Sequence, residues 1–217
     1  MLYKNRFGSV NILEDKKFYN NKTIALSMSG GADSTMLCFL LLNTIQKQKL
    51  NIKIQPYNGY DISVPADSAG LPSIITYLQK KFPAVHLYWP ISCVFDTKGA
   101  DTKNNYIRPL IEKLCDNKVV DEVVQAVCLG PPEDVQENFI GDDYFRRPGY
   151  PLWEEVVEAK NHAPFVNIDK RFIAQAYIDF GIIELLDMTN SCTRPQGNCG
   201  ECWWCQERAW AIMEANK

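Results

Sequence analysis

The sequence has no apolar run long enough to cross a membrane. A membrane-spanning helix needs about 20 consecutive apolar residues, and no stretch of the 217-residue chain comes near that length. The opening residues, MLYKNRFGSVN, also lack the apolar core of a secretory signal. We therefore expect no membrane association and a cytoplasmic location, in a reducing compartment.

Positive charge is not in excess either, because the formal net charge is −3. Proteins that bind nucleic acids usually present a basic face, so the composition favours small-molecule chemistry without a nucleic-acid partner. Histidine is scarce, with two residues in the chain. His86 and His162 fall in no motif, and we expect both to be structural.

Internal repeats, low-complexity tracts and linkers are absent as well, which predicts one domain over residues 1–217. Apolar segments of strand and helix length alternate along the chain. This alternation predicts an α/β fold, a Rossmann-like parallel sheet with helices on both faces. The expected strands are 23–28, 52–57, 85–89, 122–129 and 164–167. The expected helices are 33–47, 71–82, 106–117, 152–161, 169–180 and one that starts near 203.

Residues 27–35, SMSGGADST, join the first predicted strand to the first long predicted helix. Such a junction favours an anion, most often phosphate, and ligands of parallel sheets bind at the carboxyl ends of the strands. The segment has neither the lysine of a Walker loop nor a G-x-G-x-x-G fingerprint. The alternative is a plain strand-to-helix turn with an Asp or Ser cap.

The remaining pattern, S-G-G-x-D-S, resembles the loop of the N-type ATP pyrophosphatases, which cleave ATP to AMP and pyrophosphate. The glycines would let phosphates approach the main chain, and the hydroxyls would donate to phosphate oxygens. Asp33 would cap the helix or help to hold magnesium. The predicted nucleotide-binding residues are Ser29, Gly30, Gly31, Asp33, Ser34 and Thr35.

Four of the eight cysteines fall within fourteen residues, in the spacing C-x6-C-x2-C-x2-C. Four thiolates can surround a zinc ion at about 2.3 Å and leave no open position, so the metal would be structural. An iron–sulfur cluster and a redox pair among the last three cysteines are the alternatives. The predicted ligands, within a zinc-binding segment 190–208, are Cys192, Cys199, Cys202 and Cys205.

Together, the glycine loop and the cysteine segment resemble the 7-cyano-7-deazaguanine synthases. The likeness also includes Asp169–Lys170, the run FGIIELLDMTNSC and Arg208, and it covers residues 23–42 and 164–212. It implies an adenine-nucleotide hydrolase-type fold, often dimeric, with ATP, magnesium and one structural zinc. Lys170 would contact phosphate and act in catalysis with Asp33 and Ser34.

The reaction of that family makes a nitrile for the 7-deazaguanine (queuosine) pathway from 7-carboxy-7-deazaguanine, ammonia and two ATP. This chain lacks the family's Gly-Gln after the second strand and its Pro-Gly-Arg-Asn segment. The alternatives are therefore a relative that uses another carboxylate or stops at the amide, a sulfur-transferring thiolase, and a nucleotide-binding module without activity. A reactive Cys93 beside the nucleotide would favour the thiolase.

Secondary candidates for contacts with substrate are Arg194, Arg146, Arg147 and Asp61, each with a solvated surface role as the alternative. We expect the remaining cysteines of apolar segments to lie in the core, and the tryptophans of the terminal segment to pack its helix against the body. These residues are Cys38, Cys115, Cys128, Trp203, Trp204 and Trp210.

Overall fold

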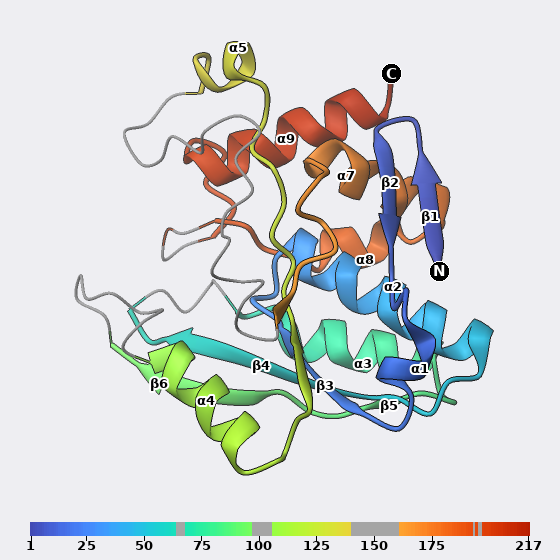
Figure 1. Ribbon diagram of the computed structural model, residues 1–217. Coiled ribbons are helices and arrows are strands. Elements are labelled where there is room, and N and C mark those ends of the chain that lie inside the picture. Colours follow the sequence, from blue (N-terminus) through green and yellow to red (C-terminus); the bar gives the residue numbers. More distant parts are fainter. Residues whose placement is uncertain (64–67, 97–105, 140–160, 193, 195–196) are drawn as a thin grey trace.

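A parallel β-sheet forms the centre of the protein (Figure 1), whose computed structural model describes residues 1–63, 68–96, 106–139, 161–192, 194 and 197–217. The strand order is β5-β4-β3-β7-β8, and β6 also pairs with β4. Every pairing within this sheet is parallel. The strands are β3 (Thr23–Ser27), β4 (Lys53–Asp61), β5 (His86–Leu87), β6 (Ile91–Phe95), β7 (Glu122–Val124) and β8 (Asn161–His162).

Helices cover both faces of the sheet, as the sequence predicted. Successive side chains of a strand point to opposite faces. Ile24 and Leu26 of β3 accordingly belong to the large core beneath α2, α3 and α7, whereas Ala25 packs with Leu114 of α4 on the other face. The helices are α1 (Lys16–Tyr19), α2 (Ala32–Gln48), α3 (Leu71–Lys81), α4 (Arg108–Asp116), α5 (Glu133–Gln136), α7 (Lys170–Asp179), α8 (Ile183–Asp187) and α9 (Trp203–Ala215).

Helix α2 is the central helix of the large core. Residues 34–45 are buried without interruption, as expected of a helix enclosed on all sides. It begins at the glycine loop and ends at Lys49, which adopts the left-handed conformation with φ 53°. Its bounds agree with the predicted helix 33–47 to within one residue, and the burial fixes the direction in which its N-terminus points.

The edge of the sheet beside β4 departs from the prediction. A strand over 85–89 was expected to end at Pro90, but pairing with β4 resumes after that proline, in β6. The interruption lies opposite Pro56, which has no N–H to donate to its neighbour. The side chain of Gln55 compensates by donating to the Trp89 carbonyl at 2.9 Å.

One predicted strand is too long and another is wrong. β7 ends at Val124 rather than at 129, and residues 164–167 form a turn, with the outer strand β8 lying just before them. In that turn Val166 donates to the Ala163 carbonyl and Ile168 to the Phe165 carbonyl, so these amides are not available to a sheet. The predicted helix 152–161 lies outside the described residues except for its last position, which belongs to β8.

An N-terminal hairpin that the sequence analysis missed ties the two ends of the chain together. Its strands are β1 (Leu2–Asn5) and β2 (Gly8–Asn11), which pair antiparallel. Arg6, in the turn between them, donates to the carbonyls of Glu214 and Ala215. These carbonyls belong to the last turn of α9, where helix carbonyls lack intrahelical partners, so the hairpin caps the terminal helix.

The tryptophans of α9 pack it against the body, as predicted. Trp203 is buried and meets Phe139 edge-on with ring centroids 5.7 Å apart. Trp210 packs against a cluster formed by Ala174, Ala211 and Ala215. The predicted core cysteines Cys38 and Cys128 are buried, and Cys115 is half-buried beside the core around α4.

No helix in the described part of the chain has both the length and the apolar character needed to cross a membrane.

Gly70, at the start of α3, lies against the segment that leads into the cysteine cluster. A Cβ atom at this position would lie 2.2 Å from the Met188 carbonyl oxygen. Because that oxygen belongs to the main chain, it cannot move away by a rotamer change. Gly70→Ala should therefore lower the free energy of unfolding by about 1–3 kcal/mol, the usual cost of overpacking, as measured by urea denaturation.

The matched control is Ser73→Ala, an exposed position in the first turn of the same helix. Its free energy of unfolding should stay within about 0.5 kcal/mol of the original. Equal stability of the two variants would show that α3 and the Met188 segment do not pack as described.

Candidate functional site

The glycine loop lies at the point where the strand order of the sheet reverses. It leaves the carboxyl end of β3, and β3 is flanked by β4, the next strand in the chain, on one side and by β7 on the other. Ligands of open α/β sheets bind in the crevice at such a switch point, outside the carboxyl ends of the strands. The sheet therefore places residues 28–34 where a nucleotide-binding fold needs its phosphate contacts.

The backbone of the loop leaves the N-terminus of α2 without a side-chain cap. Gly30 has φ +83°, a conformation that strains other residues, and Gly31 is the N-cap with φ −78°. The first intrahelical N–H donor beyond the cap is that of Thr35, so the preceding amides remain at the helix end. Among the described residues no side chain caps α2, so the proposed capping role of Asp33 is wrong.

Two serine hydroxyls lie side by side at the mouth of the loop. The Oγ atoms of Ser29 and Ser34 are 3.3 Å apart, and Ser29 Oγ accepts from the Gly31 amide at 3.3 Å. Ser34 Oγ also donates to the Gly31 carbonyl. Ser34 is buried, and Thr35 fully so, whereas Ser29 is exposed. The loop thus brings two hydroxyls and the free end of a helix together, a set of donors suited to an oxyanion.

A chain of charged groups, half-buried at Asp33 and buried at Lys170 and Glu207, runs from the glycine loop to the terminal helix. Lys170, the first residue of α7, is 7% exposed, and its Nζ lies 3.4 Å from Asp33 Oδ2 and 2.8 Å from Glu207 Oε2. Burial by itself would lower the pKa of Lys170, but the carboxylates of Asp33 and Glu207 outweigh it and raise that pKa above its ordinary value. Lys170 is therefore a charged ammonium that bridges two carboxylates.

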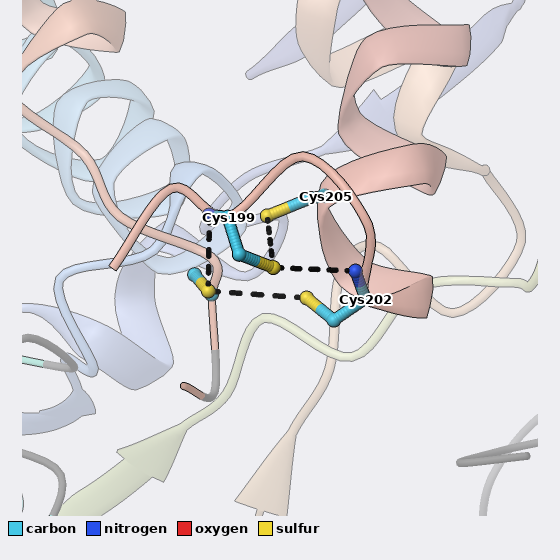
Figure 2. Close-up of side chains that lie close together, drawn as sticks. Cys199, Cys202 and Cys205 are labelled. Atoms are coloured by element: carbon cyan, nitrogen blue, oxygen red, sulfur yellow. Dashed lines mark hydrogen bonds between the residues drawn. The ribbon is translucent and has the colours of Figure 1, made fainter. Parts of the chain in front are cut away.

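The four predicted metal ligands converge. Their Sγ atoms all lie within 4.8 Å of one another, with Cys199–Cys205 at 4.0 Å and Cys192–Cys202 at 3.9 Å. A tetrahedron of sulfurs around zinc has edges of about 3.8 Å, so the spacing fits one tetrahedral ion. Figure 2 shows the sulfurs of Cys199, Cys202 and Cys205 turned toward one another. A cluster of several irons would hold the sulfurs farther apart.

Backbone amides support the sulfurs on the side of the loop. Arg194 and Cys199 donate to Cys192 Sγ at 3.4 and 3.5 Å, and Cys202 donates to Cys199 Sγ at 3.3 Å. Such N–H bonds stabilise thiolates, and those from Cys202 and Glu201 lower the pKa of Cys199 to about 6. Burial raises the pKa of Cys205 to about 12. The Sγ atoms of Cys192 and Cys199 thus accept backbone N–H bonds on the side of the loop.

The segment between α8 and the knuckle forms a wall of the glycine loop. Asn190 donates its amide to the Gly30 carbonyl at 3.1 Å, and a Cβ at Gly31 would lie 3.6 Å from the Asn190 oxygen. Arg208 fixes this segment by donating to the carbonyls of Thr189 and Leu186 at 2.8 Å. The glycine loop and the cysteine cluster are far apart in the sequence but are therefore in direct contact through this segment.

The secondary candidates are more dispersed. Arg194 pairs with Glu201 on the surface at 3.1 Å, and Asp61 accepts from Ser63 at the end of β4. Cys93 donates to the Asn58 carbonyl, and burial raises its pKa, which lowers its reactivity. His86 lies on the exposed side of β5. Arg146 and Arg147 lie outside the described residues.

Glu207 is the site residue that the sequence analysis missed. It is fully buried, although glutamate is almost never buried unless it is paired. In the sequence, Glu207 lies between Cys205 and Arg208 in a helical segment, where a solvated polar residue is the ordinary expectation. Glu207 pairs with Lys170, which is 37 positions away in the sequence, and this pairing could not be inferred from spacing.

Comparisons with protein-family models and with curated proteins find no match. Among solved structures, the chain is similar to a U34-tRNA thiolase from Methanococcus maripaludis that carries a [4Fe-4S] cluster. The TM-score is 0.48 at 14% identity over 89% of this chain, which spans 65% of the thiolase. It is also similar to an NAD+ synthetase from Burkholderia pseudomallei, with a TM-score of 0.40, 12% identity, and coverage of 90% and 77%. Likenesses at this level assign no activity to this chain.

If the four cysteines bind a metal ion, loss of one of them should remove it. In Cys202→Ser a buried sulfur ligand is replaced, so the purified protein should contain far less than one zinc per chain. Because the knuckle also holds α9 and the loop wall, the melting temperature should fall by several degrees. Metal content is measured by inductively coupled plasma mass spectrometry and stability by calorimetry.

Cys93→Ser is the matched control, since Cys93 lies on β6 and not in the cluster. It should retain the full metal content. Equal metal contents in the two variants would contradict the assignment of the ligands.

Proposed function

We propose that this chain is an ATP-dependent ligase that activates a carboxylate by adenylation and releases AMP and pyrophosphate. The observation that carries the proposal is the position of the glycine loop. An uncapped N-terminus of a 17-residue helix and two adjacent hydroxyls occupy the switch point of the parallel sheet. Residues 29–34 would hold the leaving pyrophosphate, where negative charge develops.

The chemistry explains why such a loop is needed. A carboxylate does not react with ammonia, because oxide is not a leaving group. When the carboxylate oxygen attacks the α-phosphorus of ATP, the bond between that phosphorus and the bridging oxygen breaks and pyrophosphate leaves. Ammonia then adds to the acyl carbon, AMP leaves with the electron pair of its bond, and a proton passes to solvent. Magnesium, when bound, neutralises charge on the polyphosphate.

We propose that the four cysteines bind one structural zinc ion per chain. The convergence of the sulfurs and the N–H bonds to them support this choice over an iron–sulfur cluster, because the spacing suits a single ion. Four sulfur ligands leave no open position for substrate. The ion would therefore act by fixing segment 188–192, and through Asn190 the glycine loop, rather than by taking part in the reaction.

The finer proposal is that the substrate is 7-carboxy-7-deazaguanine and the product 7-cyano-7-deazaguanine. It is supported by the combination of an S-G-G-x-D-S loop with a C-terminal cysteine knuckle followed by Arg208. A second adenylation, on the amide oxygen, would allow loss of AMP to give the nitrile. We propose ammonia and this small molecule as its partners, with no nucleic acid. The raised pKa of Cys93 goes against the thiolase alternative.

The direct test is to incubate the metal-loaded protein with ATP, magnesium, ammonium and 7-carboxy-7-deazaguanine. AMP and pyrophosphate should appear only when the carboxylate is present, and mass spectrometry should detect the nitrile. Amide without nitrile would indicate a shortened reaction. Absence of AMP with this and with a panel of other carboxylic acids would refute a ligase and favour a binding module.

Removal of the Ser34 hydroxyl should slow the reaction. If this hydroxyl donates to the departing pyrophosphate, Ser34→Ala should lower kcat by about 10²–10³-fold, the usual cost of one transition-state donor. Zinc content should not change, because Ser34 is not a ligand. Ser73→Ala, on the exposed side of α3, serves as the control, and equal rates in both variants would exclude the loop assignment.

A further inference from the structure

The sheet ends beside β4 in two short strands that follow one another along the chain. Strands β5 and β6 both pair with β4, and in the described part of the chain no further strand pairs with either of them. The outer side of an edge strand carries backbone N–H and C=O groups that can serve as a template for another chain. The two strands differ in what satisfies these outward groups.

In β5 the protein satisfies the outward groups itself. The Tyr88 N–H donates to the Ile54 carbonyl of β4. Because these directions alternate along a strand, the N–H and C=O of Leu87 point away from β4. The Leu87 N–H donates to the Val85 carbonyl at 3.0 Å, and the Leu87 carbonyl accepts from the Gln79 side chain at 2.9 Å. This part of the edge is therefore closed to another chain.

In β6 the outward groups are open. The Phe95 carbonyl accepts from the N–H of Ile62, just after β4, at 2.9 Å. By alternation Cys93 also faces β4, whereas the N–H and C=O of Ser92 and Val94 point outward. Both of these residues are exposed, Val94 by 65%. The strand sequence, ISCVF, contains neither charge nor proline, which are features that usually protect a free edge.

The outward groups of β6 are symmetric about its central residue, since Ser92 and Val94 lie one position before and one after Cys93. When two copies of β6 pair antiparallel about that residue, Ser92 of each exchanges both backbone hydrogen bonds with Val94 of the other. All the outward groups are then satisfied. A shift by two residues would place Val94 opposite Pro90, which has no N–H, or Ser92 beyond the end of the strand.

We propose that β6 is a dimerisation surface, and that it pairs antiparallel with β6 of a second copy of this chain across a two-fold axis at Cys93. A second copy fits because the outward groups are self-complementary and a strand without charge brings no like charges together. Exposed Trp89 and Ile62, near the two ends of the strand, add apolar surface. Because both copies use the same edge, the assembly closes as a dimer.

The inference is independent of the proposed function, because β4 separates β6 from the strand that leads into the glycine loop. Sedimentation velocity of the full-length, zinc-loaded protein should show a particle of twice the chain mass of 24.8 kDa. In Val94→Lys an ammonium group stands on each edge strand, which should raise the dimer Kd by about tenfold or more.

Met213→Lys is the matched control for the added charge. Met213 is an apolar residue of α9 that is 53% exposed, comparable with Val94. Its dimer should be as strong as that of the unaltered protein. Both variants should keep the original melting temperature, because each substitution is made at an exposed position.

Oxidation tests the register of the paired strands. The central pair of the proposed arrangement is not hydrogen-bonded, so its Cα atoms should lie about 4.5 Å apart. This distance is within the range of about 4.4–6.8 Å that a disulfide spans. Diamide, which takes up the two thiol hydrogens, should therefore link Cys93 to Cys93 of the second copy. The reaction is run at alkaline pH, since burial raises the pKa of Cys93 and the thiolate is the reacting form.

Cys93→Ser controls for the other cysteines and should give no linked dimer on a non-reducing gel. Ser92→Cys in the Cys93→Ser background moves the thiol off the axis, so the two Cα atoms lie diagonally at about 7–8 Å. This variant should link much more slowly. A protein that stays monomeric at every concentration, a dimer of unchanged strength in Val94→Lys, or a dimer in which Cys93 does not link would each overturn the proposal.

Discussion

The contact between segment 188–192 and the glycine loop is the constraint on which the candidate site depends. The backbone N–H of Asn190 donates to the Gly30 carbonyl. The Met188 carbonyl lies so close to Gly70 that a Cβ atom would not fit there. The loop is therefore not a free turn. Its shape is fixed from behind by a segment more than 150 residues away in the sequence, and that segment is fixed in turn by the cysteine knuckle.

In the proposed function, a metal held by the four cysteines would support the site without taking part in the reaction. A fully coordinated metal cannot bind substrate, but it can hold the chain on either side of it. Asn190 and Ser191, before the cysteine cluster, lie against the glycine loop. Helix α9, after the cluster, reaches the same loop because its Glu207 pairs with Lys170, which pairs with Asp33. Two independent connections therefore run from the cysteine cluster to the start of α2.

Packing alone does not explain why charged side chains lie between α2, α7 and α9. Apolar contacts hold α2, α7 and α9 together, and a core of this kind does not need an ion pair. Charges placed there cost stability, and they lie next to the first turn of the helix that follows the glycine loop. The Nζ atom of Lys170 lies 2.8 Å from Glu207 and 3.4 Å from Asp33, so one ammonium joins α9 to the first turn of α2.

The sequence by itself determined the parallel α/β fold, the place of the glycine loop and the identity of the four clustered cysteines. These features depend on local patterns: an apolar segment of helix length for α2, two adjacent glycines for the loop, and short spacing for three of the cysteines. The tertiary structure decided the rest. The break between β5 and β6 depends on Pro56 in the neighbouring strand, and the pairing of Glu207 with Lys170 joins two helices. Such contacts between distant residues leave no periodic trace in a single sequence, because each side chain meets its partner only after the sheet and helices have packed.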